Sequence, residues 1–311
     1  MRSEADPEPE WIMINRAVVT LMPLVPRSLV WRVSRRYIAG RTLDDALATV
    51  RSLNERGMSA TLDVLGEDAT REEAAVAGRD LYLEALASIE RAGLDCNVSV
   101  KLSQMALRFD VELCRGILED LVAEATRRGN FVRIDMEDSS VTDATLDLYR
   151  DLRRRSDAVG TVVQSYLKRT PDDVARMLEE GIAHLRLCKG IYVEPFEVAH
   201  QGRERIRTAY MEVLRQLFEG GATRVGIATH DRPLIEGALD LIRELGVPKE
   251  RYEFQMLLGV TEGIRTELVS AGEPLRVYVP FGEEWYAYSS RRLRENPKIA
   301  GHVIRNIFTQ S

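Results

Sequence analysis

Cysteine is scarce in this sequence. The three that occur, Cys96, Cys114 and Cys188, are odd in number and show no CxxC spacing. Disulfide frameworks need an even set of cysteines, and zinc sites need cysteine and histidine ligands at short, regular spacing. We therefore expect neither disulfides nor a metal site, and a reducing cytoplasm is the expected compartment.

Long apolar runs are also missing. No window reaches the roughly 18 apolar residues that span a bilayer, and the closest, residues 11–26, is interrupted by two prolines, an asparagine and an arginine. A signal peptide is not expected, because the residues before this stretch are acidic where a signal peptide is basic. Residues 11–43 carry six arginines and no Asp or Glu. Peripheral contact with an anionic membrane surface therefore stays open, beside simple packing of this segment on the main domain.

The sequence also lacks an excess of positive charge and a dinucleotide-binding motif. The net charge is −6 and the isoelectric point is about 5.5, whereas nucleic-acid binders usually present a basic face. No nucleic-acid partner is expected. The fingerprint GxGxxG occurs at no strand-to-helix turn, which argues against a Rossmann sheet.

What the sequence does contain, from residue 57 onward, is eight short apolar runs that alternate with helical patterns. The runs span residues 58–66, 97–103, 131–137, 161–167, 183–190, 224–230, 252–259 and 275–282. This alternation predicts an α/β fold, a (β/α)8 barrel of the TIM type with extra N-terminal helices. Residues 1–56 are expected to form a helical segment packed on the barrel, and residues 57–311 the barrel itself.

Several helices have recognisable ends. Thr170 is expected to be an N-cap, with Pro171 in the first turn and Gly181 just past the end. Asp110 is placed to begin another helix that stops at Gly129.

Polar residues cluster near the ends of the predicted strands. They are Lys101, Arg133, Asp135, Gln164, Arg186, Lys189, Thr229, His230, Gln255 and Tyr278. Active sites of such barrels lie at the C-terminal ends of the strands, so these groups predict a polar mouth. Structural roles stay open: Lys101 and Asp135 could pair across strands, His230 could cap the next helix with Asp231, and Gln255 could bind backbone groups.

The segment 278–297 crowds three tyrosines, a tryptophan and three arginines together. Arg291 and Arg292 are adjacent, and Tyr288 precedes them by one helical turn. Taken alone, the segment is better explained as a solvated basic helix surface. Together with Arg186 and Lys189, the paired arginines indicate an anionic ligand, a carboxylate or a phosphate.

The motifs in order are LDVLGE, VSVKLS, RIDMED, QSYL, RLCKGIY, ATHD, YEFQMLLG and RVYVPFGEEWYAYSSRRLRENP, between residues 62 and 297. With them the chain resembles the proline dehydrogenase family, whose members are FAD-dependent (β/α)8 barrels. The resemblance implies oxidation of L-proline to 1-pyrroline-5-carboxylate, the first step of proline catabolism. Hydride passes from proline C5 to N5 of FAD, and electrons pass on to a membrane quinone.

The resemblance also implies roles for residues around the substrate. Arg291 and Arg292 look like the clamp on the proline carboxylate, with Lys101 as a further partner and Tyr288 over the ring. The other positions similar to the family's substrate side are Asp135, Glu67, Leu187 and Tyr278. Lys101, Asp135, Arg186 and Tyr278 form the expected catalytic set.

On the cofactor side, Arg186 resembles the group near flavin N5. The remaining positions similar to FAD contacts are Gln164, Lys189, Gly190, Ile191, Tyr192, Thr229, His230, Asp231 and Glu295. Asp231, Ile191 and Val193 depart from the common pattern, which leaves contacts to the adenine and pyrophosphate open.

Two other functions stay open from the residues alone. One is a class I aldolase-like barrel with Lys101 or Lys189 as the Schiff-base lysine. The other is a noncatalytic barrel that binds an anionic metabolite through the arginine pair.

Overall fold

A computed structural model describes residues 27–66, 68–286 and 288–289. Its strands are β1 Ser59–Val64, β2 Cys96–Val100, β3 Val132–Ile134, β4 Val159–Gln164, β5 His184–Cys188, β6 Arg224–Ala228, β7 Tyr252–Leu257 and β8 Leu275–Phe281. Its helices are α2 Arg27–Ser34, α3 Leu43–Asn54, α4 Glu72–Arg91, α5 Val111–Arg127, α6 Thr142–Arg153, α7 Thr170–Glu179, α8 Arg203–Glu219, α9 Arg232–Leu245 and α10 Glu262–Ser270, with short 3-10 turns at Ser139–Val141 and Lys249–Arg251.

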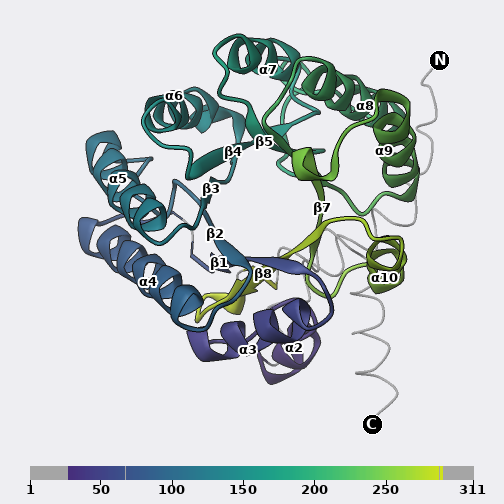
Figure 1. The fold of residues 1–311 in the computed structure, drawn as a ribbon. Coiled ribbons are helices and arrows are strands. Elements are labelled where there is room, and N and C mark those ends of the chain that lie inside the picture. The colour runs from purple at the N-terminus through teal and green to yellow at the C-terminus, as the bar shows by residue number, and fades with distance from the viewer. Residues whose placement is uncertain (1–26, 67, 287, 290–311) are drawn as a thin grey trace, which may run out of the picture.

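The eight strands are parallel and close into a barrel in chain order, with β8 beside β1 (Figure 1). The predicted (β/α)8 fold is therefore confirmed, and each predicted apolar run overlaps one strand, although β2 and β4 begin one and two residues earlier than predicted. Strand residues that point outward are apolar and meet the helices. Val98 and Val100 of β2, for example, share one fully buried core with Leu118 and Leu121 of α5.

The barrel interior is polar, which is unusual, because bulky aliphatic side chains commonly fill it. Arg186 of β5 reaches across to Asp135, which follows β3, and to Gln255 of β7. Tyr278 of β8 also reaches Asp135. Charged groups in such an interior must be paired, since an unpaired buried charge is costly.

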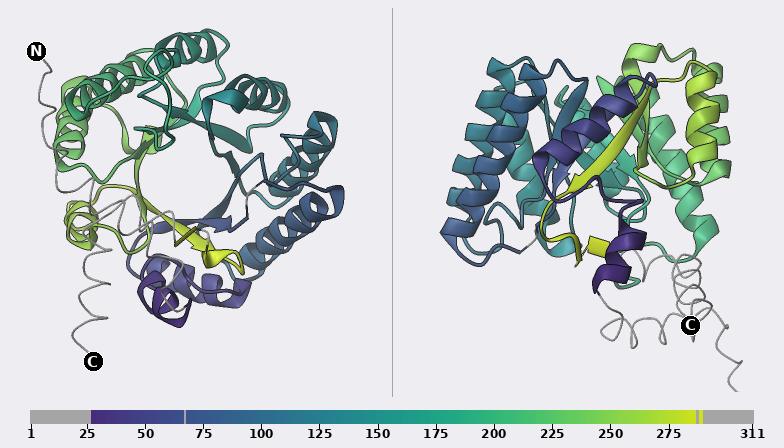
Figure 2. Two further views of the ribbon diagram at one scale, coloured as in Figure 1. Left: turned by 180° about the vertical axis from the view of Figure 1, so that it is seen from behind. Right: turned by 90° about the horizontal axis from the view of Figure 1, so that it is seen from below.

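Helix α3 covers the seam between β1 and β8 from outside (Figures 1 and 2). Its buried residues Ala46, Val50 and Leu53 belong to the main core. Helices after the last strand usually close such barrels, but here the described chain beyond β8 turns toward the barrel mouth. Tyr288 is buried at this mouth, and Trp285 is buried against Trp31 of α2. The extra N-terminal helices are thus present, and one of them completes the barrel wall.

One predicted helix start is wrong. Thr170 is the first residue of α7 and caps nothing; its hydroxyl donates to the carbonyl of Gln164 at 2.6 Å. Thr170 therefore binds the end of β4 and leaves α7 without a side-chain cap. The Asp110 cap is confirmed, since its carboxylate accepts from the Leu113 amide at 3.0 Å. Gly129 and Gly181 end their helices with φ of +61° and +68°.

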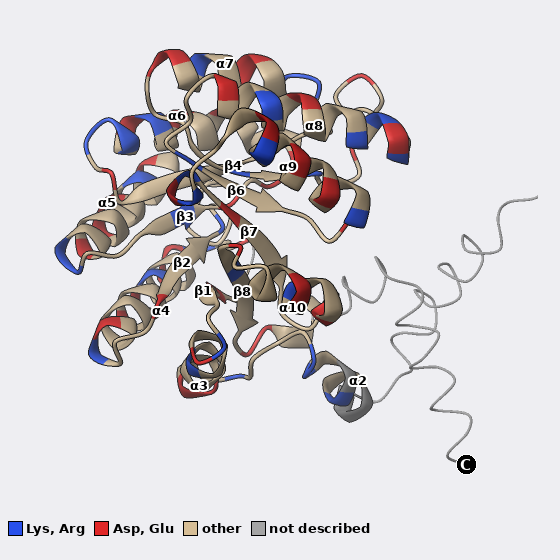
Figure 3. Cartoon of the chain, turned by 45° about the vertical axis from the view of Figure 1, so that its right-hand side comes forward, with Lys and Arg blue, Asp and Glu red and all other residues tan. Residues whose placement is uncertain are grey.

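The outer helices carry acidic and basic residues side by side, with no large zone of one sign in Figure 3. A typical pair joins Arg215 of α8 to Glu244 of α9 at 2.8 Å. Across the ranges that the structure describes, no helix has the length and apolar character needed to cross a bilayer.

Candidate active site

A cavity of about 380 Å³ opens at the C-terminal ends of the strands. It brings together most of the predicted site: Lys101, Asp135, Gln164, Arg186, Lys189, Gly190, Ile191, Tyr192, Thr229, His230, Tyr278 and Tyr288. Met136, Val162, Met256 and Leu257 add apolar wall. The expected polar mouth is therefore present.

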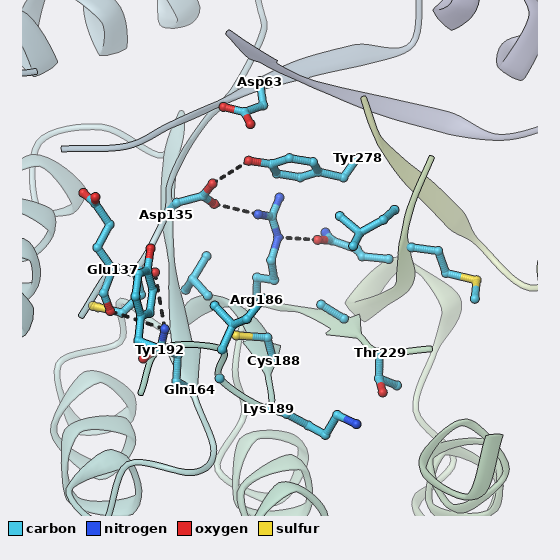
Figure 4. A pocket seen from close by; sticks show the side chains of 18 of the residues that line it. Asp63, Asp135, Glu137, Gln164, Arg186, Cys188, Lys189, Tyr192, Thr229 and Tyr278 are labelled. Carbon is cyan, nitrogen blue, oxygen red and sulfur yellow. Dashed lines mark hydrogen bonds and ion pairs between the residues drawn. The ribbon is translucent and has the colours of Figure 1, made fainter. Parts of the chain in front are cut away.

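Asp135 is the centre of the site (Figure 4). One carboxylate oxygen accepts from Nη1 of Arg186 and from the Ser99 hydroxyl, both at 2.7 Å. The other oxygen accepts from the Tyr278 hydroxyl at 2.7 Å. Burial, with Asp135 alongside, raises the pKa of Tyr278 well above its usual value, so the phenol remains a donor. The result is a rigid unit that fixes the Arg186 guanidinium in the cavity.

The ion pair between Lys101 and Asp135, left open from the sequence, is not the one that the structure shows. The Lys101 ammonium lies 2.9 Å from both carboxylate oxygens of Asp63, a fully buried residue of β1. Sequence reasoning missed Asp63, although an acid inside the apolar run TLDVL was a usable signal. Both β1 and β3 are neighbours of β2, and Lys101 binds the acid on the β1 side.

Lys189 is held from behind by Asp231 at 3.2 Å. Asp231 also binds Arg207 of α8, and hydrogen bonding from Arg207, with the nearby Lys189 charge, lowers its pKa to about 2 against the effect of burial. Asp231 is buried behind the cavity wall, whereas Lys189 lines the cavity. The chain's own carboxylates therefore already offset part of the positive charge that the sequence placed at the mouth.

His230 does not cap α9. Its Nε2 accepts from the Leu257 amide at 3.1 Å, and its Nδ1 lies 2.9 Å from the Thr261 hydroxyl. The geometry assigns the ring proton to Nδ1, because Nε2 accepts from an N–H group. His230 thus ties the end of β6 to the loop after β7 at the rim of the cavity.

Two predicted residues lie away from the mouth. Leu187 is fully buried on the outer face of β5, between the inward-pointing Arg186 and Cys188, because successive strand residues face opposite ways. Arg133 points inward but lies two residues before Asp135, one layer deeper, and lines a cavity at the opposite end of the barrel. Glu67, Arg291, Arg292 and Glu295 lie outside the described residues.

Sequence reasoning also missed Glu137 and Cys188 on the cavity wall. Burial raises the pKa of Glu137, whose carboxylate accepts from the Ser103 amide at 2.8 Å. Burial raises the pKa of Cys188 to about 12. The Cys188 thiol therefore remains protonated, and a thiolate nucleophile is absent from this position.

The wall contains one unsatisfied acceptor. The Gln164 amide nitrogen donates to the carbonyls of Met136 and Glu137 at 3.4 and 3.3 Å, while its Oε1 is buried without a partner among the described residues. Buried acceptors of this kind call for a donor. A planar heteroaromatic ring with an N–H edge, lying between apolar walls near Arg186 and Lys189, satisfies this requirement, and a flavin has these features.

Comparison with known proteins agrees with these features. Residues 46–305 match the family model described as proline dehydrogenase. Proline dehydrogenase 1 of Bacillus subtilis subsp. natto is 36% identical over 88% of this chain and 90% of its own. Proline dehydrogenase of Deinococcus radiodurans is 32% identical over 95% of this chain and 98% of its own.

A solved structure shares the fold. It is proline utilization A (PutA) from Bdellovibrio bacteriovorus, inactivated by N-propargylglycine, with a TM-score of 0.84 and 24% identity. The match covers 93% of this chain and 37% of that protein.

Proposed function

The chain belongs to the proline dehydrogenase family, and we propose that it oxidises L-proline to 1-pyrroline-5-carboxylate with bound FAD. The observation that carries the proposal is the Asp135 unit, which fixes Arg186 and Tyr278 beside the unsatisfied Gln164 acceptor in one cavity. Asp135, Arg186, Tyr278 and Lys101 are the proposed catalytic set.

The flavin would be held by Gln164, Arg186, Lys189 and the backbone at Gly190, which all line the cavity. When bound, it supplies the two-electron oxidant that accepts hydride from C5 of proline. Arg186 presents a fixed positive charge, which favours the negative charge that accompanies two-electron reduction. Asp135 keeps that charge in place through its 2.7 Å contact with Arg186 Nη1.

Lys101, with Arg291 and Arg292 proposed from sequence, would bind the proline carboxylate. Asp63 holds the Lys101 ammonium through both oxygens, so its position is set before substrate arrives. Cations near the substrate nitrogen favour its neutral form, whose lone pair forms the C=N bond as the C5 hydride leaves. The N–H proton then departs to solvent or a nearby base.

We further propose a membrane quinone as the electron acceptor and peripheral contact of a cytoplasmic protein with the membrane. The basic, acid-free segment 11–43 supports this proposal. Pelleting with anionic vesicles at low salt, and loss of pelleting at high salt, is the expected result.

The Schiff-base alternative is less favourable. Such a lysine needs a free amine lone pair, yet Lys101 is paired with Asp63 and Lys189 with Asp231.

An absorbance scan separates the three functions. We expect purified protein to show a flavin spectrum that bleaches when proline is added without oxygen. Covalent attachment of a carbonyl compound to the protein after borohydride treatment would support the aldolase-like function. Absence of both signals would leave the noncatalytic barrel and overturn our proposal.

Adding one methyl group at Gly190 is expected to weaken flavin binding more than at any other glycine of the site. Its φ of +110° is strained for any other residue, and an added Cβ would clash with the Tyr166 ring. Gly190→Ala should therefore reduce flavin content, measured as the ratio of flavin to protein absorbance. Gly181→Ala is the control, because Gly181 has positive φ and no atom within 4 Å of an added Cβ. Equal flavin content in both variants would contradict the role of Gly190.

Tyr288 is expected to control substrate size. Its side chain is buried and lines the cavity, where it would oppose a hydroxyl at C4 of the substrate. Tyr288→Ser should lower the preference for proline over trans-4-hydroxyproline by about 10-fold, within the roughly 1–3 kcal/mol available from one pocket contact. The measurement is the ratio of kcat/KM for the two substrates. Tyr286→Ser is the control, since Tyr286 packs on Trp285 and is outside the cavity lining. An unchanged ratio in Tyr288→Ser would assign Tyr288 to packing alone.

A further inference from the structure

A second cavity, of about 330 Å³, lies at the opposite end of the barrel, where the strands begin. Six strands contribute polar side chains to its wall, namely Asn97, Arg133, His184, Arg224, Glu253 and Arg276. The proposed proline reaction uses none of these residues.

Arg133 is the central feature of this cavity. It is 3% exposed, and its Nη1 donates to the carbonyls of Thr161 and His184, both at 2.8 Å. Its guanidinium lies 4.9 Å from the centre of the Phe131 ring. Its Nε is buried without a partner, and no carboxylate of the described residues forms an ion pair with it. A buried guanidinium satisfied only by carbonyls and a ring lacks a counter-charge.

The neighbouring charges do not supply one. Arg276 and Arg224 share the buried carboxylate of Glu253, at 2.8 and 2.9 Å. Among the described residues, the one other acid on the cavity wall is Asp95, which is mostly exposed and 3.9 Å from Arg276. Three guanidinium groups therefore face one buried carboxylate. Burial, together with Arg186, lowers the pKa of Arg133 to about 9, so it remains charged at neutral pH.

The slot for Arg133 is built into the barrel. A Cβ on Gly160 of β4 would lie 2.8 Å from the Phe131 ring and would also meet Arg133 Nη1. Glycine at position 160 therefore leaves the space that the Arg133 guanidinium occupies. Beside it, the Asn97 side-chain oxygen accepts from Thr61 and Arg276, which leaves the Asn97 amide nitrogen as a donor on the wall.

We propose that this cavity is a second, noncatalytic site that binds a small, singly charged carboxylate through Arg133 and Asn97. A carboxylate matches the planar fork of a guanidinium and can accept from the amide as well. A ligand with one negative charge would balance the charges on the wall. Three guanidinium groups carry three positive charges, whereas Glu253 and the more distant Asp95 supply two negative charges. The inference is independent of the proposed proline reaction.

The test uses the full chain and acetate as the probe, with melting temperature recorded at constant ionic strength. Acetate should raise the melting temperature of the wild type. Because acetate could also enter the active-site cavity, Lys101→Met is measured alongside. The increase should persist in Lys101→Met and in Arg265→Met, the matched buried arginine of α10, and should be lost in Arg133→Met. Loss in Lys101→Met with retention in Arg133→Met would overturn the site, as would a response to phosphate alone.

Arg133→Met could fail to fold, so location is tested without a variant. Crystals grown with bromide should show an anomalous peak beside Arg133 that acetate displaces. A data set with no such peak, or with peaks only at the strand C-terminal mouth, would overturn the proposal.

Discussion

Replacing Asp135 with asparagine is expected to lower kcat/KM for proline by about 150- to 5000-fold. The change keeps the shape of the side chain but removes the charge that pairs with Arg186 at 2.7 Å. The Arg186 side chain is 8% exposed, and removing one partner of a buried pair commonly costs about 3–5 kcal/mol. In the proposed site, the substitution would leave the Arg186 guanidinium, which must stay charged beside the flavin, without its carboxylate partner.

Two control variants separate charge from packing in this experiment. Tyr278→Phe removes one neutral donor to the same carboxylate, and a bond to a charged group contributes about 1.5–3 kcal/mol. Its loss of kcat/KM should therefore be smaller. Ser99→Ala should have the mildest effect, because Arg186 still holds the shared oxygen. Wild-type kcat/KM in Asp135→Asn, with normal flavin content, would remove Asp135 from the catalytic set.

Replacing Glu253 with glutamine should give the largest loss of stability. Glu253 is buried and accepts from Arg276, Arg224 and the Gln255 amide, at 2.8, 2.9 and 2.6 Å. The glutamine would leave two guanidinium groups without their carboxylate. We expect the free energy of unfolding to fall by about 3–5 kcal/mol, measured by urea denaturation. Glu244→Gln is the control, since its pair with Arg215 lies at the surface and its loss should scarcely move the unfolding midpoint.

The same carboxylate should give the fold an acid-sensitive component. Burial acts to raise the pKa of Glu253, but Arg276 and Arg224 prevail and lower it to about 2 from an ordinary value of 4.5. A lowered pKa in the folded state stabilises the protein at pH values above the unfolded pKa, and this stabilisation is lost as pH falls toward the folded value. The wild type should therefore lose stability between about pH 5 and pH 2, and Glu253→Gln should lose less over that interval. Parallel profiles would contradict the assignment.

The strand pattern was predictable because β-branched runs and helix caps are local signals. All eight runs became strands, and Asp110 caps its helix as expected. Thr170 misled because the choice between a cap and a bond to Gln164 depends on where β4 ends in space. The residues around Thr170 do not determine how far its hydroxyl lies from the carbonyl of Gln164.

The site was predictable as a set of residues but not as a set of partners. Lys101 and Asp135 both point into the barrel, yet each is bound to a group that the sequence did not link to it, Asp63 and Arg186. Which inward side chains meet depends on the stagger of the strands around the closed barrel. Leu187 illustrates a simpler failure, because the twofold alternation along β5 already placed it opposite Arg186.

The covering of the β1–β8 seam by α3 has a consequence for how the chain folds. Helix α3 and strand β1 are synthesised early, but Ser59 of β1 pairs with Arg276 of β8, 217 residues further along the chain. Contacts this distant in sequence form slowly, since a long loop must close first. We expect the last stage of folding to be the arrival of β8, and until then the free edge of β1 is open to pairing with other chains. A nascent chain stalled before residue 275 should therefore need a chaperone, although it already contains seven of the eight strands.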